Sequence, residues 1–131
     1  AKLLVAAVLS LCVVLSGCRA DACGNQIVSE VVAPDGETRA VLFQRDCGAT
    51  TGFSTQISVM TRGEQPLGSG NAFVADDDHG AAAAASWGGP WAEMLWASPT
   101  RLVIRYDERA RVFASPTRVG NVRVSFEKVA R

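Results

Sequence analysis

The sequence contains a single histidine, and it has no excess of either charge. Its 131 residues carry 13 basic and 13 acidic side chains, so the formal net charge is zero. A general nucleic-acid binder usually has a clear basic excess, and this balance therefore argues against nucleic acid as a partner. Any histidine-based catalysis would have to use His79. The Gly-x-Ser-x-Gly motif of one large hydrolase class is also absent from the chain.

Long apolar runs are lacking too, apart from one near the N-terminus. Lys2 precedes a thirteen-residue apolar segment, residues 3–15, in which Ser10 is the only strongly polar side chain. A membrane-spanning helix needs about 20 such residues, whereas the apolar part of a signal peptide is shorter. The sequence therefore predicts a signal peptide over residues 1–17.

Leu15-Ser16-Gly17-Cys18 follows this segment directly and resembles the lipobox of bacterial lipoproteins. The resemblance implies that the Cys18 thiol receives a diacylglyceryl group and that Cys18 becomes the N-terminus after cleavage. Two or more acyl chains would hold the protein stably at a membrane. Ordinary signal cleavage after Ala20 or Ala22, or an uncleaved anchor, are the alternatives.

The residue after the lipidated cysteine carries information about location in Gram-negative bacteria. An Asp at that position often retains a lipoprotein in the inner membrane, and here the position is Arg19. The resemblance therefore implies a cell-envelope protein, anchored in the outer membrane and facing the periplasm if the source is Gram-negative. Residues 18–24 are expected to form the lipid-anchored linker.

Four cysteines are present, and two of them remain once the signal peptide and the lipid are accounted for. Cys12 leaves with the signal, and Cys18 carries the lipid, which leaves Cys23 and Cys47. Disulfides persist outside the cytoplasm, so these two cysteines are candidates for a bridge. A reactive Cys47, with its thiolate favoured by nearby Arg45, is the alternative.

A turn signal midway between these cysteines supports the bridge. Residues 33–36 read Ala-Pro-Asp-Gly, and Asp35 lies twelve residues from both Cys23 and Cys47. A hairpin folded about this turn places the two cysteines almost opposite each other, at about the separation that a disulfide requires. The sequence therefore predicts a Cys23–Cys47 disulfide.

Short segments with strand-like patterns follow one another beyond residue 25, and no long amphipathic helical pattern occurs after residue 18. Expected strands cover residues 26–33, 38–45, 53–59, 72–75, 91–96, 101–106, 110–114 and 121–129. Residues 76–90 hold five alanines bounded by glycines, which predicts a loop, with a short helix as the alternative. We therefore expect one all-β domain over residues 25–131, an antiparallel sandwich or small barrel of about seven or eight short strands.

Three motifs together resemble a family of small, uncharacterised bacterial proteins that are often predicted lipoproteins. They read CGN at residues 23–25, PDG at residues 34–36 and RDCGATTGFSTQ at residues 45–56. The resemblance covers about residues 23–80. It implies a domain type but no known activity, so it assigns no functional residue.

Two loops are the expected contact surfaces, because loops on a rigid sheet commonly carry recognition. They are the 48–52 connection and the 76–91 loop. The candidate binding residues are Thr50, Thr51, His79, Trp87 and Trp91. The expected partner is an envelope protein, a peptide or a glycan. For the tryptophans, capping of the core is the alternative role.

Residues 76–79 read Asp-Asp-Asp-His, and Asp76, Asp78 and His79 are weak candidates for binding a divalent cation. Neighbours in an extended chain point to alternate sides, so a solvated acidic loop is the favoured alternative. No cofactor is expected. The leading function is a non-enzymatic binding or envelope interaction module. A metal-dependent hydrolase centred on His79 and a purely structural envelope protein are the alternatives.

Charge is distributed unevenly along the chain. Residues 18–100 carry four basic and ten acidic side chains, whereas residues 101–131 carry eight basic and three acidic ones. A basic edge of this kind suits an anionic partner, such as lipid headgroups or a polyanion. The favoured alternative is that acidic and basic strand faces lie side by side in solvent, because runs of charged residues are more often solvated surface than binding sites.

Overall fold

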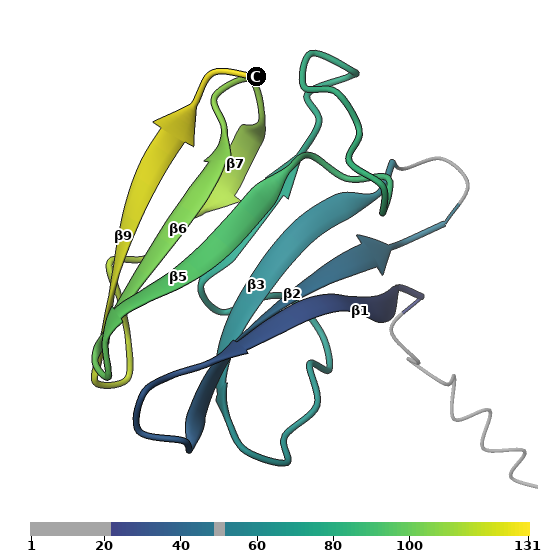
Figure 1. Cartoon of the computed structure of the whole chain (residues 1–131). Helices are drawn as coiled ribbons and strands as arrows, with labels where there is room; N and C mark the ends of the chain where they lie inside the picture. The colour runs from purple at the N-terminus through teal and green to yellow at the C-terminus, as the bar shows by residue number, and fades with distance from the viewer. Residues whose placement is uncertain (1–21, 49–51) are drawn as a thin grey trace, which may run out of the picture.

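The computed structural model describes residues 22–48 and 52–131, which form two packed β-sheets (Figure 1). The strands are β1 (Gly24–Val32), β2 (Thr38–Asp46), β3 (Ser54–Thr61), β4 (Phe73–Asp76), β5 (Ala92–Ser98), β6 (Arg101–Asp107), β7 (Arg111–Ala114), β8 (Arg118–Val119) and β9 (Val122–Val129). The five-stranded sheet has the order β1-β2-β3-β4-β7, and the four-stranded sheet has the order β5-β6-β9-β8. Within these residues, no helix is long and apolar enough to cross a membrane.

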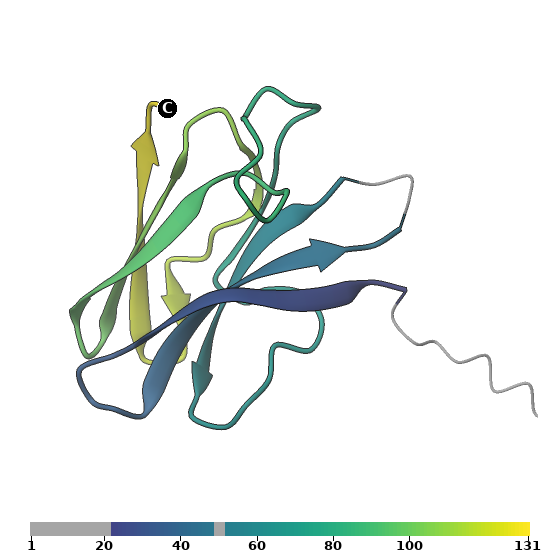
Figure 2. The same ribbon diagram turned by 45° about the vertical axis from the view of Figure 1, so that its right-hand side comes forward.

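The core lies between the two sheets and is built by period-two alternation. In β6, Leu102, Ile104 and Tyr106 are buried, while the residues between them lie on the outer face. The buried core cluster consists of Ala40, Leu42, Ile57, Ala72, Phe73, Ala75, Ala92, Met94, Leu102, Ile104, Tyr106, Val122 and Val124. The all-β prediction is confirmed, and the architecture is a sandwich; the two layers are visible in Figures 1 and 2.

All eight predicted strands are present, with ends displaced by at most two residues. The two-residue strand β8 was not predicted. Residues 77–91 contain turns and one isolated bridge between Ala84 and Pro90, so the loop prediction is confirmed and the short-helix alternative is wrong. Because β1 begins at Gly24, the folded unit also includes the end of the segment expected to be linker.

One strand pair departs from the expected antiparallel arrangement. Strands β6 and β9 pair in parallel, with Arg101 opposite Arg123 and Ile104 opposite Phe126. The chain leaves β6 for β7 in the other sheet and returns through β8, so β9 enters from the same end as β6. The parallel pair is therefore a consequence of the chain crossing between the layers.

The hairpin of β1 and β2 carries the predicted disulfide, Cys23–Cys47. Gly24 lies opposite Asp46, so the two cysteines occupy the next pair along the hairpin. A β-bulge between Ile27 and Ser29 shifts the register by one residue along this ladder. The disulfide prediction is confirmed, and a free Cys47 thiol is excluded in this structure.

The outer face of the five-stranded sheet is partly covered by residues 62–71, which we call the covering segment. Val41 and Phe43 of β2 point away from the sandwich core, yet both are fully buried. Hydrogen bonds from the covering segment reach three strands of the sheet, including one from the Gly70 N–H to the Gln56 side chain at 2.7 Å. The covering segment thus gives this half of the sheet a second buried layer.

Candidate functional site

The connection and the loop predicted as contact surfaces meet at one end of the five-stranded sheet. One open cavity of about 360 Å³ on the outer face is lined by Asp77 and His79 from the loop, by Gly52 at the end of the connection and by Cys47 just before it. This cavity is called the outer cleft below. His79 therefore lies across the cleft from the flanks of the connection, whereas Thr50 itself lies outside the described residues, as does Thr51.

Strand alternation supplies the floor and the far wall of the outer cleft. Ser54 and Gln56 of β3 reach the outer face because the residue between them, Thr55, points to the core side. Asp76 of β4 and Arg111 of β7 are direct partners in the β4–β7 ladder. The cleft is thus built by strands that are far apart in the sequence.

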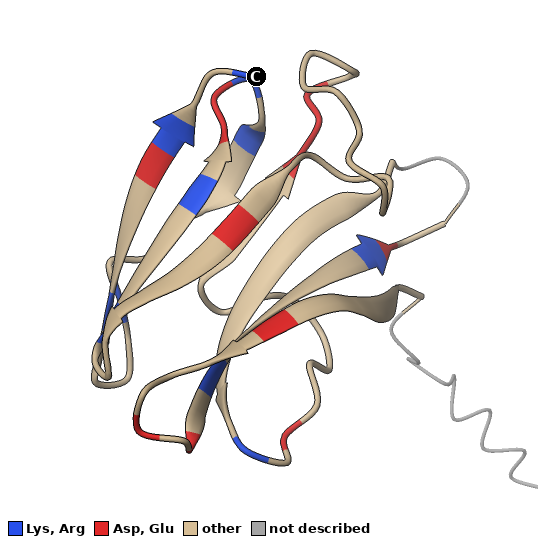
Figure 3. Cartoon of the chain, viewed as in Figure 1, with Lys and Arg blue, Asp and Glu red and all other residues tan. Residues whose placement is uncertain are grey.

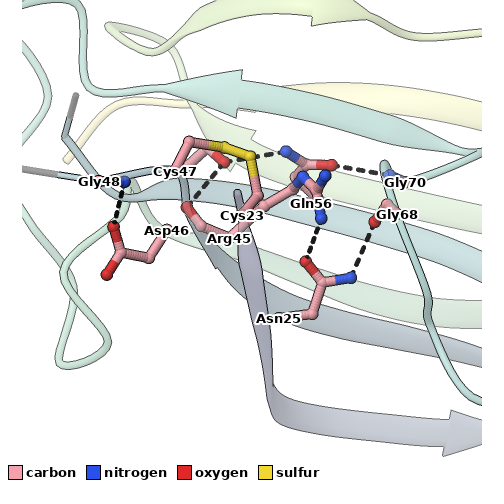
Figure 4. The surroundings of a disulfide bond; sticks show 10 residues. Cys23, Asn25, Arg45, Asp46, Cys47, Gly48, Gln56, Gly68 and Gly70 are labelled. Atoms are coloured by element: carbon pink, nitrogen blue, oxygen red, sulfur yellow. Dashed lines mark hydrogen bonds between the residues drawn. A yellow bond between two sulfur atoms is a disulfide. The ribbon is translucent and has the colours of Figure 1, made fainter. Parts of the chain in front are cut away.

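A hydrogen-bonded network beside the disulfide connects β1 and β2 to the covering segment (Figure 4). The buried Arg45 side chain donates to Asn25 Oδ1 at 2.7 Å. Asn25 Nδ2 donates in turn to the carbonyl oxygens of Pro66 and Gly68, at 2.7 and 2.8 Å. These side chains belong to the CGN and RDCGATTGFSTQ motifs, and in the fold they tie the covering segment to β1 and β2.

Asp76 and Arg111 form a two-pronged ion pair on the wall of the cleft. Arg111 Nε lies 3.1 Å from Asp76 Oδ1, and Nη2 lies 2.6 Å from Oδ2. The hydrogen bonds from Arg111 hold the pKa of the Asp76 carboxyl below its ordinary value, and they raise the pKa of Arg111. A cation bound by Asp76 would first have to displace this guanidinium.

The weak metal candidates lie at the last residue of β4 and on the tight turn that follows it. Asp78 and His79 both have positive φ angles, 52° and 56°, and Asp78 N–H donates to Asp76 Oδ1 at 2.9 Å. Asp and His are among the side chains that tolerate this left-handed backbone. Over the described part of the chain, no group of three or more His, Cys, Asp or Glu side chains is placed to hold a metal ion.

The outer cleft contains both a serine and the histidine, but their geometry is not that of an activated nucleophile. The Ser54 hydroxyl donates to the Arg45 carbonyl at 3.3 Å and accepts from Gln56 Nε2 at 2.9 Å. Among the residues that the structure describes, no hydrogen bond joins Ser54 to His79. A nucleophile needs a base within hydrogen-bond reach, and this serine is instead engaged with the backbone.

Two tryptophans cap the core and link the sandwich layers. The Trp87 indole N–H donates to Thr55 Oγ1 at 2.9 Å, and the Trp96 indole N–H donates to the Val31 carbonyl at 2.8 Å. Both rings pack against the core cluster. Buried indole N–H groups need such partners, so these contacts fit the capping role better than an open aromatic platform.

Trp91 lies apart from the capping tryptophans, and its ring faces the end of the chain. The Arg131 guanidinium lies 4.2 Å from the Trp91 ring centroid, within cation–π distance. Trp87, in contrast, lines a cavity of about 440 Å³ together with Ile27 and Phe53. We call this cavity the mouth, because it opens between edge strand β1 and the 77–91 loop.

Several residues of the outer cleft had no signal in the sequence. Arg111 and Phe113 come from β7, which is separated from β4 by more than thirty residues and by a crossover to the other sheet. Arg45 was noted only as a neighbour of Cys47. The β4–β7 pairing brings Arg111 and Phe113 to the cleft.

Comparisons of the chain with protein-family models, with curated proteins and with solved structures found no significant match. The geometry of the described residues is therefore the basis for the functional proposals that follow.

Proposed function

We propose that this chain is an exported, lipid-anchored and non-enzymatic binding module of the bacterial cell envelope. The observation that carries the proposal is the Cys23–Cys47 disulfide at the point where the chain enters the domain. Disulfides of this kind form in oxidising compartments outside the cytoplasm. The lipobox-like sequence ends only five residues before Cys23, so a lipid on Cys18 would hold the domain close to a membrane.

The outer cleft and the adjoining mouth form the proposed contact surface. Phe113, at the rim of the outer cleft, is 61% exposed, and Phe53, in the mouth, is 41% exposed. Exposed apolar side chains beside polar groups are typical of interaction sites. The polar groups of the outer cleft are engaged within the protein, since the Ser54 hydroxyl donates to the Arg45 carbonyl and Asp76 accepts from Arg111. This supports a binding role over a catalytic one. The expected partner remains an envelope protein, a peptide or a glycan.

The tether is tested by expressing the chain with its signal sequence in a bacterial host and determining the N-terminal mass. We expect a mature chain that begins at acylated Cys18 and fractionates with membranes. A Cys18→Ala variant should stay unprocessed. If the Gram-negative location holds, the mature protein should fractionate with the outer membrane. A mature chain that begins at Asp21 or Cys23, without lipid, would contradict the anchor.

The contact surface is tested by crosslinking in intact membranes. Phe113→Ala and His79→Ala should each reduce a crosslink to an envelope partner that the wild-type protein forms. Leu67→Ala is the matched control, because Leu67 is 88% exposed and lies on the covering segment, outside both cavities. Equal crosslinking by all three variants, together with a weakened envelope in a deletion strain, would favour the purely structural role.

A further inference from the structure

Three arginines form a row across the outer face of the four-stranded sheet. Arg123 of β9 lies directly opposite Arg101 of β6 in the parallel ladder and directly opposite Arg118 of β8 in the antiparallel one. All three side chains are exposed on the face turned away from the core. Arg101 begins β6 directly after the β5–β6 turn, and Arg118 and Arg123 lie on either side of the β8–β9 turn. Figure 3 shows the basic positions of the chain in blue and the acidic positions in red.

This arginine row is not neutralised by acidic side chains. Within residues 22–48 and 52–131, the ion pairs of the structure do not include any of the three arginines. The next charged row on the same face is arranged differently, because Arg105 is flanked by Glu93 at 2.5 Å and by Glu127 at 3.2 Å. Like charges directly opposite each other in a sheet are destabilising, so the row is unfavourable for the free fold.

A cavity lies over the arginine row. It has a volume of about 370 Å³ and is lined by the three arginines, by the hydroxyl residues Thr117 and Ser125, and by the apolar residues Ala97, Val103 and Val124. This volume is within the range of small-ligand sites. Guanidinium forks donate paired hydrogen bonds to the oxygens of phosphates, and hydroxyl groups complete such sites.

The position of the row also bears on the source of the ligand. The Trp96 indole contacts Val31 near the end of β1, and Arg101 pairs with Ser98 just beyond Trp96. The row thus lies at the end of the sandwich opposite to Cys23, where the described chain begins. A membrane that held the domain through the N-terminus would lie at the other end, which favours a ligand from the surrounding solution.

From these observations, we propose that the arginine row is a binding site for a phosphate group, presented as the dianion of a phosphate monoester. Neutralisation by two negative charges would relieve the repulsion among three adjacent arginines. The site is distinct from the outer cleft, and it gives a structural reason for the basic excess in residues 101–131.

The proposal is tested by calorimetry and thermal unfolding of the purified full chain with inorganic phosphate and glycerol 3-phosphate, and with chloride as the reference anion. We expect both phosphates to bind and to raise the melting temperature. Arg123→Gln and Arg118→Gln should each weaken phosphate binding by about tenfold or more. Arg109→Gln, which removes an exposed arginine of the β6–β7 turn, should leave binding unchanged.

The unliganded variants give a second measurement that does not require a ligand. Arg123→Gln should unfold at the same temperature as the wild-type protein or at a higher one, because it removes a charge flanked by two like charges. Arg105→Gln should unfold at a lower temperature, because it leaves Glu93 and Glu127 without their partner. A loss of stability in Arg123→Gln equal to that in Arg105→Gln would overturn the proposal.

A vesicle arm separates soluble phosphates from lipid headgroups. Binding of residues 19–131, which lack both the apolar signal segment and Cys18, to vesicles that contain phosphatidic acid, with loss of that binding in Arg118→Gln, would assign the phosphate to a membrane surface. Binding of soluble phosphates alone would assign it to a small molecule. Equal heats with phosphate and chloride, or unchanged affinity in both arginine variants, would overturn the site.

Discussion

Gly70 of the covering segment lies close against the backbone of the five-stranded sheet. A Cβ at this position would lie 2.7 Å from the carbonyl oxygens of both Ile57 and Phe73, and 3.0 Å from the Ile57 nitrogen. These are backbone atoms of two paired strands, so they cannot move aside as the end of a flexible side chain would. Glycine is therefore required here by close approach.

We expect Gly70→Ala to lower the free energy of unfolding by about 2 kcal/mol, because the methyl group forces the covering segment off the sheet. Thermal unfolding followed by circular dichroism would show this as a fall of about 8 °C in Tm. Gly24→Ala is the control, since a Cβ there meets nothing within 4 Å. Equal melting temperatures for the two variants would show that the covering segment adjusts without cost.

Asp76 is the residue whose ionisation is tied most directly to the outer cleft. Its pKa is held below the ordinary value of 3.8 by hydrogen bonds from Arg111. A carboxyl with a lowered pKa in the folded state stabilises the fold above its unfolded pKa, and that contribution is lost as the pH falls through the folded value. The ion pair should therefore contribute at neutral pH and vanish in acid.

Asp76→Asn should consequently lower the free energy of unfolding at about pH 7, by no more than about 1 kcal/mol because the pair is partly exposed. Denaturant titrations should show the difference from the wild-type protein staying constant down to about pH 4 and then closing at lower pH. A difference that persisted in strong acid would mean that Asp76 acts through packing instead of charge.

For single residues, the sequence predicted contacts between residues of the same hairpin, because such contacts follow from their spacing about the turn. The spacing of Cys23 and Cys47 about one turn predicted their disulfide, although their exact register also depends on the bulge in β1. Arg101 and Arg123 illustrate the opposite case, because their juxtaposition depends on a parallel pairing between strands that are not consecutive. Side-chain type alone carried no information about that contact.

Among the elements, β1 shows how the hairpin reaches the disulfide register. Near the turn, Val32 pairs with Arg39, a register that would carry on to place Cys23 opposite Gly48. The bulge at Val28 absorbs one residue of β1, and beyond it Ile27 pairs with Phe43. The prediction that Cys23 and Cys47 lie opposite each other was therefore correct. It assumed a regular hairpin from the turn onward, whereas the observed register also requires the bulge.

Deletion of Val28 should leave the disulfide in place, because the two flanking residues keep their partners in a regular ladder. The same deletion should raise self-association, because a bulge is one of the features that protect an edge strand from pairing with another chain. Sedimentation over a range of concentrations, together with a thiol assay, measures both effects.

Val28→Ala, which keeps the residue count and hence the bulge, is the control and should sediment as the wild-type protein does under the same conditions. Free thiols in the deletion variant would contradict the register argument. A deletion variant that stayed disulfide-bonded and monomeric would show that the bulge does not guard the edge.

Local sequence patterns predicted most of the strands but neither the shortest strand nor the strand order. The local sequence pattern, which is alternation in some segments and apolar composition in others, located eight strands. It did not reveal β8, whose two residues are too short for any alternation, or the order of strands within the sheets. Both depend on where the chain crosses between layers, which local patterns do not encode.

At the scale of the whole molecule, the two candidate sites lie at opposite ends of the sandwich. The outer cleft adjoins Cys47, whose disulfide partner Cys23 directly precedes β1. The arginine row lies beyond the other end of β1. Nine residues of β1 span about 30 Å, whereas the five residues from Cys18 to Cys23 reach at most about 17 Å. A lipid on Cys18 would therefore hold the cleft end near the membrane and leave the arginine row in solution.

This orientation predicts a difference in quenching by spin-labelled lipids when the lipidated protein is placed in vesicles. A fluorophore on Ala81→Cys, in the loop beside the outer cleft, should be quenched more strongly than one on Asn121→Cys, in the turn beside the arginine row. The same labelled variants made as residues 19–131, which lack both the apolar signal segment and the lipid, should show no quenching at either position. Stronger quenching at position 121 would mean that the domain lies with its arginines against the headgroups, and the phosphate bound there would then be a lipid phosphate.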